Sequence, residues 1–372
     1  MPILIETTMR RRSAGLKIRP ARRDVWSPRS SIGAASCLLF ALIFLCACAT
    51  GERTPYALVD ITPVPVSAPL GYYQNIAWLQ PEVLALEYLD SLETENWDTR
   101  LMIYDLATGE NSLLSDDVPA DCHETRYGRF NHLPNGNLAY LWECIPLRGI
   151  ARDFRLHLWD PTTQIDQENY RYPIPFWATA FSFAPTMDRW LQEQTGDGLF
   201  NKLHYVENGQ EPVQLLERSF ARAGWPSWLP DGRIVFAGTP QLPESKRNIF
   251  SGVPSLMAQL NQPWNIYVTD LESLLAGSVG EEQVVLRGIV GIRGPVASPD
   301  GSALAFLGTY QGHEGLWAYR LDTKKLARVW AGFGPFAWSP DGDELMVLVR
   351  EPDVKFFLGK PARIKLPDLL LN

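Results

Sequence analysis

The feature that most constrains the fold is a short motif that recurs along the chain. In each copy an apolar stretch leads through a tight turn into a second apolar stretch. Proline presets the backbone of the turn, and Asp-Gly or Asn-Gly supplies the bend in the four better copies. The motif therefore predicts six β-hairpins. In order of decreasing clarity the copies are FAWSPDGDELMVLV (336–349), PVASPDGSALAFLG (295–308), PSWLPDGRIVFAG (226–238), FNHLPNGNLAYLW (130–142), AFSFAPTMDRWLQ (180–192) and IAWLQPEVLALEY (76–88).

A second motif follows five of these hairpins, and it consists of a strand with an aromatic residue and then a polar turn. Its copies are LMIYDLATGE (101–110), LHLWDPTT (156–163), LHYVENGQ (203–210), NIYVTDLES (265–273) and LWAYRLDTKK (316–325). A fourth short strand, such as 283–286 or 326–330, completes a unit of four antiparallel strands. One such unit cannot bury both of its faces, so the units must stack radially and close a ring. The sequence thus predicts an all-β fold, a six-bladed β-propeller spanning 71–372.

Two arrangements can complete the last blade. The segments 354–358 and 362–366 can supply its outer strands, and this is the preferred arrangement. Alternatively, Tyr56–Ile61 adds a strand from the other end and latches the ring.

The Ser-Pro-Asp-Gly turn between apolar strands, with the aromatic strand that follows, resembles the TolB-like, WD-repeat-like β-propeller family over roughly 71–372. The resemblance implies the propeller fold and, by analogy with the TolB-like members, a periplasmic interaction role. It implies little about the ligand, because propellers serve as receptors, scaffolds, lyases, lactonases and peptidase gates. TolB has an additional N-terminal α/β domain, for which the roughly 22 residues between Cys48 and the propeller leave no room.

The first residues have the composition of a targeting signal. A basic region, Arg10–Arg29, precedes an apolar run, Cys37–Ala49, which is shorter than the roughly 20 residues of a membrane span. The run ends in Leu45-Cys46-Ala47-Cys48, which resembles a bacterial lipobox and implies a lipoprotein signal peptide over 1–47 with lipidation of Cys48. A simple signal peptide or an uncleaved anchor is the alternative. Residues 48–70 are rich in proline and are expected to form a semi-extended tether, from which the domain can still recruit Tyr56–Ile61.

Cysteine content and charge both bear on the environment of the mature protein. Only Cys122 and Cys144 remain after Cys48, and in an exported protein a pair of cysteines favours a disulfide over two buried thiols. Residues 48–372 carry 26 basic and 40 acidic residues, a net charge of −14. Such a charge argues against nucleic acid as a partner and against adsorption to an anionic membrane. The lipid on Cys48 is then the expected attachment to the membrane.

The expected binding sites lie at the end of the ring opposite the uniform hairpin turns, where the connecting loops vary in length. The residues that lead into the first strand of each blade ring the channel mouth; they are Tyr72, Tyr73, Arg126, Tyr127, Trp177, Trp225, Arg293 and Phe333. Aromatic rings and arginines can hold a sugar, a peptide or an anionic group, and packing between blades is the alternative reading. The longest loop, 238–264, contains a candidate docking segment with Ile249, Phe250, Leu256 and Met257, or else it packs on itself.

Catalytic and metal-binding signatures are missing from the sequence. His123-Glu124 and His313-Glu314 each lack the second histidine of a zinc protease motif, and there is no nucleophile elbow, P-loop or dinucleotide fingerprint. We therefore expect no catalytic residues, no metal and no cofactor. The resulting hypothesis is a monomeric, non-catalytic, lipid-anchored envelope propeller, at the outer membrane and periplasm or at the cell surface, that binds a protein or peptide partner. The alternative is a propeller that binds a sugar or small metabolite, as a lyase or hydrolase using its central channel.

Overall fold

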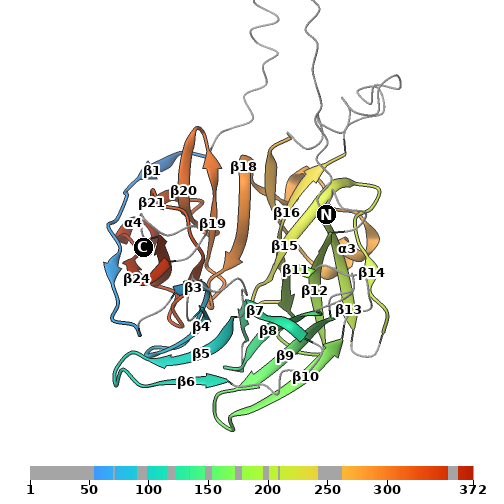
Figure 1. Cartoon of the computed structure of the whole chain (residues 1–372). Coiled ribbons are helices and arrows are strands. Elements are labelled where there is room, and N and C mark those ends of the chain that lie inside the picture. Colours follow the sequence, from blue (N-terminus) through green and yellow to red (C-terminus); the bar gives the residue numbers. More distant parts are fainter. Residues whose placement is uncertain are drawn as a thin grey trace, which may run out of the picture. The chain divides into compact units, whose positions relative to one another are not determined.

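The hairpins predicted from the turn motif are the basis of the fold in the computed structural model (Figure 1). The structure describes residues 54–69, 72–89, 99–114, 122–133, 135–146, 153–171, 178–195, 201–207, 210–241, 262–350 and 359–371, which belong to one compact unit of the chain, 53–372. The signal peptide, Cys48, Trp177 and the docking segment 249–257 lie outside the described residues. Among the residues described, no helix is long and apolar enough to cross a membrane.

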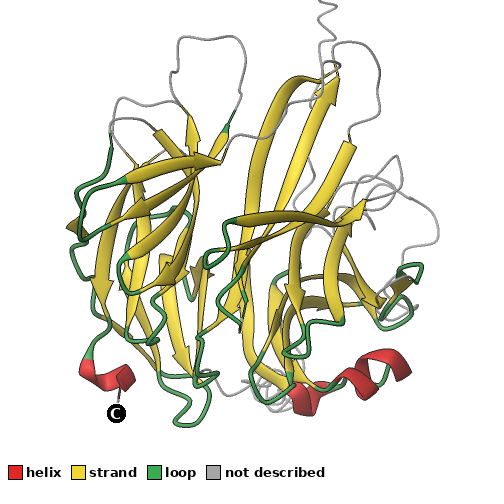
Figure 2. Ribbon diagram, turned by 90° about the horizontal axis from the view of Figure 1, so that it is seen from below, coloured by secondary structure: helices red, strands yellow, loops and turns green. Residues whose placement is uncertain are grey.

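Successive antiparallel strands form four-stranded units, which we number one to six along the chain. The strands of units one to three are β3 (Tyr72–Gln80), β4 (Val83–Leu89), β5 (Arg100–Asp105), β6 (Asn111–Leu114), β7 (Cys122–His132), β8 (Leu138–Pro146), β9 (Asp153–Asp160), β10 (Ile165–Arg171), β11 (Ala178–Phe183), β12 (Arg189–Thr195), β13 (Asn201–Glu207) and β14 (Val213–Gln214). Those of units four to six are β15 (Phe220–Trp228), β16 (Ile234–Pro240), β17 (Trp264–Thr269), β18 (Val284–Ala297), β19 (Ala303–Tyr310), β20 (His313–Arg320), β21 (Leu326–Trp330), β22 (Phe336–Trp338), β23 (Glu344–Arg350) and β24 (Gly359–Lys365). The prediction of an all-β fold built from four-stranded sheets is confirmed, and the helices within the described ranges are short: α3 (Leu271–Ala276), the 3₁₀ turn η2 (Glu281–Gln283) and α4 (Asp368–Leu371) (Figure 2).

The strand β18 belongs to two units at once. Its first part pairs with β17 as the fourth strand of unit four, and its second part pairs with β19 as the first strand of unit five. The change of partner needs register shifts at several points of the fourteen-residue strand. Units four and five therefore form one continuous sheet of seven strands, and β1 (Tyr56–Leu58) adds the eighth at its edge.

The first strands of the units contact one another in a cyclic order. Contacts join β3 to β7, β7 to β11, β11 to β15, β15 to β18 and β22 back to β3. Between β22 and β18 the indole Nε1 of Trp338 donates a hydrogen bond to the carbonyl oxygen of Val296, at 3.0 Å. A radial stack of units requires such an order.

The last unit takes its fourth strand from the N-terminal side of the fold. The short strand β2 (Val64–Pro65) runs antiparallel to β24. Further along the chain, β3 also pairs with β24, through the single residue pair Tyr73 and Gly359. The preferred prediction gave both outer strands to the C-terminal segments, but 359–365 forms only the third strand, and 354–358 lies outside the described residues. The strand expected within Tyr56–Ile61 exists as β1 (Tyr56–Leu58), yet it pairs in parallel with β21 of unit five rather than completing unit six.

This N-terminal stretch, expected to be mainly a tether, packs on the outer edges of units five and six. The ring of Tyr56 lies 5.5 Å from the ring of Trp317, and the carboxylate of Asp60 accepts two hydrogen bonds from Arg328 at 2.8 and 2.7 Å. Val59 and Ile61 pack against the core between those units. Burial of these apolar side chains explains why the segment lies on the sheets instead of remaining extended in solvent.

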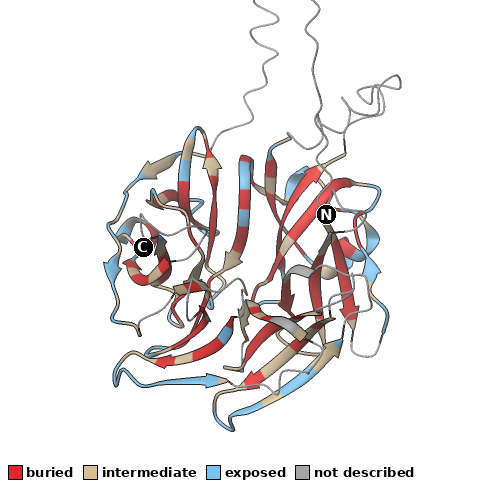
Figure 3. Cartoon of the chain, in the orientation of Figure 1, coloured by how far each residue is buried: buried red, intermediate tan, exposed pale blue. Residues whose placement is uncertain are grey.

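The core lies between neighbouring units, where their apolar faces meet (Figure 3). Phe306 and Trp317 of unit five stack at 6.5 Å and pack with Val235 and Ile266 of unit four. The outer strands are more exposed, as in β10, where Ile165 is 60% exposed. The sheets thus bury both faces of their inner strands, as the repeat predicts.

Candidate binding site

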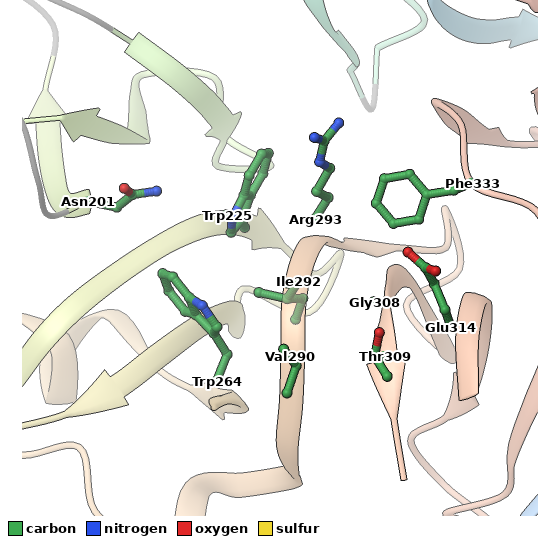
Figure 4. A pocket seen from close by; sticks show the side chains of 11 residues that line it. Asn201, Trp225, Trp264, Val290, Ile292, Arg293, Gly308, Thr309, Glu314 and Phe333 are labelled. Carbon is green, nitrogen blue, oxygen red and sulfur yellow. The ribbon is translucent and has the colours of Figure 1, made fainter. Parts of the chain in front are cut away.

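A hollow of about 430 Å³ lies on units four and five, at the end of the sheets opposite the hairpin turns (Figure 4). We call that end the loop face and the other end the turn face. The hollow is lined by Asn201, Trp225, Trp264, Val290, Gly291, Ile292, Arg293, Gly308, Thr309, Glu314 and Phe333. Its size is within the range of small-ligand pockets. Strands of units three, four and five and the segment before β22 all contribute to it.

A β-bulge in the first strand of unit four presents Trp225 to this hollow. The register of β15 against β16 shifts between Gly224 and Ser227, and Trp225 has a φ of +55°. In unit two the register shifts between Gly128 and Asn131, and Arg129 has a φ of +56°. A positive φ is unfavourable for a residue with a side chain, by roughly 1 kcal/mol or more, and such strain is typical of functional sites.

Glu193 holds the bulge in place from the neighbouring unit. Its Oε2 accepts a hydrogen bond from the backbone N–H of Trp225 at 2.8 Å, and its Oε1 accepts one from Asn201 Nδ2. Glu193 is fully buried, and a Cβ on Gly224 would collide with its carboxylate. Glycine is therefore required at position 224 by close packing, and the carboxylate fixes the backbone that carries Trp225.

Trp264 is supported by a buried cation. The guanidinium of Arg222 lies 4.4 Å from the centre of the Trp264 ring and donates hydrogen bonds to the carbonyl oxygen of Gln262 at 2.7 Å and to Thr239 Oγ1 at 3.2 Å. Burial lowers the pKa of Arg222. These contacts fix the start of β17, directly after the long loop 238–264, most of which lies outside the described residues.

Arg293 and Phe333 form the other side of the hollow. The guanidinium lies 5.1 Å from the centre of the Phe333 ring, a cation–π contact. Burial and, secondly, the positive charge of Arg129 lower the pKa of Arg293. In the view of Figure 4, Arg293 lies between Trp225 and Phe333, and the carboxylate of Glu314 is on the side of Phe333. The site thus combines flat aromatic rings, one cation, one anion and the hydroxyl and amide groups of Thr309 and Asn201.

Three of the residues expected at the channel mouth, namely Trp225, Arg293 and Phe333, come together in the hollow. Tyr73 and Tyr127 are instead almost fully buried, at 0% and 2% exposure, which corresponds to the alternative of packing between blades. The hydroxyl of Tyr73 donates to the carbonyl oxygen of Pro69 at 2.7 Å, and Tyr127 packs on Tyr140. Burial raises the pKa of Tyr73.

The remaining expected residues lie elsewhere. The ring of Tyr72 lies 5.6 Å from the ammonium of Lys360, and Arg126 lies close enough to Glu87 to attract its carboxylate. The sulfur atoms of Cys122 and Cys144 form a disulfide, with the Cα atoms 5.5 Å apart. It ties the start of β7 to the end of β8, at the loop face.

Sequence reasoning missed the two buried glutamates. Glu87 is 3% exposed, and its oxygens accept hydrogen bonds from Asn75 Nδ2 and, at 3.0 Å, from Thr99 Oγ1. Burial raises the pKa of Glu87 to about 7, although these hydrogen bonds and the charges of Arg129 and Arg126 act in the opposite direction. Glu87 and Glu193 both occupy the second strand of a hairpin, where the motif is otherwise apolar. An acidic residue in a strand that the motif makes apolar was the sequence signal that could have revealed these two glutamates.

His132, His157 and His204 lie apart from the residues that line the hollow. His157 Nδ1 lies 2.8 Å from Asp166 Oδ2, but the pair joins β9 and β10 at the outer side of unit two. Burial lowers the pKa of His132, and burial lowers that of His204 to about 4. In the described ranges no three His, Cys, Asp or Glu residues are close enough to hold a metal ion.

The comparisons with known proteins concern the fold. No family model matches the chain, and no curated protein matches its sequence. Among solved structures, an α-L-arabinanase of Penicillium chrysogenum complexed with arabinobiose aligns with 84% of this chain and 98% of its own, at 12% identity and a TM-score of 0.52. TolB of Acinetobacter baumannii aligns with 92% of this chain and 71% of its own, at 14% identity and a TM-score of 0.47.

A third similar structure is the β-propeller domain of the Trilobed protease from Pyrococcus furiosus, at 12% identity and a TM-score of 0.44 over 78% of this chain and 85% of that one. At such identities the likeness concerns the fold alone. The structural neighbours include TolB and other β-propeller proteins.

Proposed function

We propose that this protein is a six-bladed propeller, held at the bacterial envelope by a lipid on Cys48, that binds a protein or peptide partner at its loop face. The observation that carries the proposal is the hollow in which Trp225, Trp264, Phe333 and Arg293 converge. Tryptophan and arginine are the residues most enriched at the energetic centres of protein interfaces. The six units and the cyclic contacts of their first strands support the proposed blade count.

The rigid support of these side chains favours binding. Glu193 fixes the backbone of Trp225, and Arg222 fixes Trp264. Side chains that are already held in place lose little conformational freedom when a partner binds, so less of the interaction energy is lost. The hollow is also lined by Trp264, the first residue of β17.

The proposed location is supported by the lipobox-like sequence before Cys48 and by the disulfide between Cys122 and Cys144. Structural disulfides persist in exported proteins and are rare in the bacterial cytosol. Lipid attachment would place the hollow near other envelope components. This local confinement makes a weak partner interaction effective.

A second candidate function is the binding of a sugar or small metabolite. The mixture of indole rings with Asn201, Thr309 and Glu314 in the hollow favours it, because sugars stack on aromatic rings and hydrogen-bond at their edges. The similar arabinanase is complexed with arabinobiose. Arabinobiose is therefore a suitable probe for this alternative.

The test is a capture experiment with the full-length protein in detergent. Val290 is 58% exposed in the hollow, so Val290→Arg should fill the site without disturbing the core. Val213 is 51% exposed on β14, outside the lining of the hollow, and Val213→Arg is the matched control. We expect an envelope protein that is cross-linked to the wild type and to the control but not to Val290→Arg, identified by mass spectrometry.

The captured protein is then purified and its affinity measured directly. A loss of tenfold or more for Val290→Arg alone supports the proposal. Equal affinity for both variants removes the hollow from the interaction. If arabinobiose binds and no protein does, the second candidate replaces the first.

A further inference from the structure

The first stretch of the described chain is docked on the propeller. Its strand β1 runs parallel to β21 of unit five, with Tyr56 opposite Leu326. Beyond this strand, Ile61 N donates a hydrogen bond to the carbonyl oxygen of Val329 at 2.7 Å. The chain then reaches β2, which pairs with β24 of unit six. Backbone hydrogen bonds therefore fasten residues 56–65 to two neighbouring units.

The side chain of Tyr56 fastens the start of this stretch. Its ring makes edge contacts with the rings of Tyr310 and Trp317, whose centres lie 5.8 and 5.5 Å away. The hydroxyl of Tyr310 also donates a hydrogen bond to the carbonyl oxygen of Thr54, at 3.3 Å. The chain is thus held from Thr54 onward, on the side of unit five.

Docking shortens the tether between the proposed lipid and the domain. If residues 48–70 were all free, the 22 steps from Cys48 would let the chain span about 75 Å. Because the chain is held at Thr54, six steps remain, and these span at most about 21 Å. A lipid on Cys48 would therefore keep unit five close to the bilayer. Unit two, which is three units away in either direction of the cyclic order, would lie on the far side.

The hollow lies on this same side of the molecule. Two of its lining residues, Thr309 and Glu314, are paired between β19 and β20 of unit five. The next pair on this hairpin is Tyr310 with His313, whose rings both lie 5.8 Å from the ring of Tyr56. A ligand in the hollow is therefore bound beside the point at which the tether joins the domain.

Charge separates the two ligands that a membrane could offer to the hollow. Residues 48–372 carry 26 basic and 40 acidic residues, so anionic lipid headgroups are repelled. A polypeptide segment can instead offer apolar and basic side chains to Trp225, Trp264 and Glu314 of the lining. We propose that the docked stretch 54–65 holds unit five against the membrane, and that the hollow receives a segment of a membrane protein just outside the bilayer. This inference rests on the proposed function and specifies its partner.

The first experiment measures which side of the domain is near the bilayer. The mature lipoprotein is reconstituted in vesicles of phosphatidylethanolamine and phosphatidylglycerol that contain an acceptor lipid. A fluorescent donor is attached to Thr323→Cys in unit five or to Thr163→Cys in unit two, each exposed in the turn between the third and fourth strands. With Cys48 lipidated and Cys122 bonded to Cys144, the new thiol is the only free one. We expect energy transfer to be at least twofold more efficient from position 323.

Two changes to the tether should each remove most of this difference. Tyr56→Ala combined with Asp60→Ala removes the ring contacts and the ion pair with Arg328, which frees the chain as far as β2. A linker of about 30 Gly and Ser residues, inserted before the docked stretch, leaves that stretch intact and adds roughly 30 Å of reach. Asp231→Ala is the matched control, because it removes an exposed ion pair with Arg233 in unit four and should change nothing.

The second experiment identifies what lies in the hollow. A photoreactive amino acid replaces Val290, which is 58% exposed in the hollow, or Val213 on β14 as the control. Irradiation takes place in membranes of the source bacterium. We expect position 290, but not position 213, to become linked to a protein that stays in the membrane during an alkaline carbonate wash, which removes peripheral proteins.

The outcomes separate this inference from the proposed function. Equal energy transfer from both positions, or a difference that survives both tether changes, overturns the inference and leaves the proposed function intact. A cross-link to a protein that carbonate releases has the same meaning. A cross-link to a phospholipid alone overturns the inference, because the membrane surface itself is then the ligand. If the protein does not associate with vesicles at all, the lipid anchor is absent, and both the inference and the proposed function fail.

Discussion

The turn face and the loop face of the same strands are built on different principles. At the turn face the hairpins repeat one hydrogen-bond pattern. In unit five Gly301 N donates to the Ser298 carbonyl oxygen at 2.9 Å, and in unit six Gly342 N donates to that of Ser339 at 3.0 Å. The glycines have φ values of +71° and +76°, which glycine adopts without strain. The hydrogen bonds that close each of these turns therefore join residues only a few positions apart.

At the loop face the contacts join different units. Glu193 of unit three fixes Trp225 of unit four, and Thr99 of unit one accepts the N–H of Tyr127 of unit two at 2.9 Å. The positive φ values here fall on Trp225 and Arg129, for which they are unfavourable. The comparison teaches that local sequence specifies the turns, even where Met187 takes a positive φ in place of glycine, whereas contacts between units specify the loop face.

The largest effect is expected when a carboxylate that joins two units is removed. Glu193→Ala leaves the N–H of Trp225 and the amide of Asn201 without their acceptor in a buried site, and it should lower the free energy of unfolding by about 4 kcal/mol. Glu193→Gln retains one acceptor oxygen and should lose clearly less. Denaturant unfolding of both variants measures the difference. Equal losses would mean that side-chain volume, not hydrogen bonding, holds the loop face together.

The other buried carboxylate should make stability depend on pH. The pKa of Glu87 is raised to about 7 in the folded protein from 4.5, so between these values the folded chain keeps a proton that the unfolded chain releases. Its contribution is therefore fully present below about pH 4.5 and is lost as the pH rises through about 7, by up to roughly 3 kcal/mol. Glu87→Gln cannot ionise and should remove this slope. The free energy of unfolding, measured from pH 4.5 to pH 8 for both proteins, tests the assignment. An unchanged slope in the variant would assign the pH dependence to other groups.

The smallest effect is expected at the turn face, where neighbouring turns differ only in what surrounds them. Gly232→Ala meets nothing within 4 Å and should cost about 1 kcal/mol, the strain of a φ of +88°. In Gly301→Ala the new Cβ would also lie 2.7 Å from Pro230 Cδ of the neighbouring turn, so the loss should be about 2 kcal/mol. Thermal unfolding of the pair tests whether adjacent turns pack against each other. Identical midpoints would show that each turn is independent.

This contrast also explains what could be predicted from the sequence. The hairpins were predicted because proline, Asp-Gly and Asn-Gly act within their own turn. Even the degenerate copy in unit three forms the same turn, with Met187 at a φ of +64° in place of the glycine. Glu87 and Glu193 were missed because their partners lie in other strands and units. The pairing of Tyr56–Leu58 with unit five could not be predicted, because an edge strand accepts any suitable extended segment.

At the hollow the prediction was partly successful for the same reason. Trp225 and Arg293 precede regular hairpins, so the turn motif places them near the loop face. Whether a residue there is buried or accessible depends on the neighbouring unit. Tyr127 lies in one core cluster with Leu79 and Leu101 of unit one, whereas the bulge presents Trp225 to the hollow. No local pattern in a single sequence distinguishes a residue that becomes buried at the loop face from one that stays accessible.

The strand shared by units four and five has a mechanical consequence for the site. Units six and one are joined by the single backbone pair Tyr73 with Gly359, whereas a shift of unit four against unit five would break backbone hydrogen bonds along the fourteen-residue strand β18. The hollow lies across this junction, with Val290, Ile292 and Arg293 all on β18. A ligand bound in the hollow would therefore contact a continuous sheet with no hinge between units four and five. If a partner binds in the hollow as proposed, its selectivity is set by the fixed shape of this shared sheet.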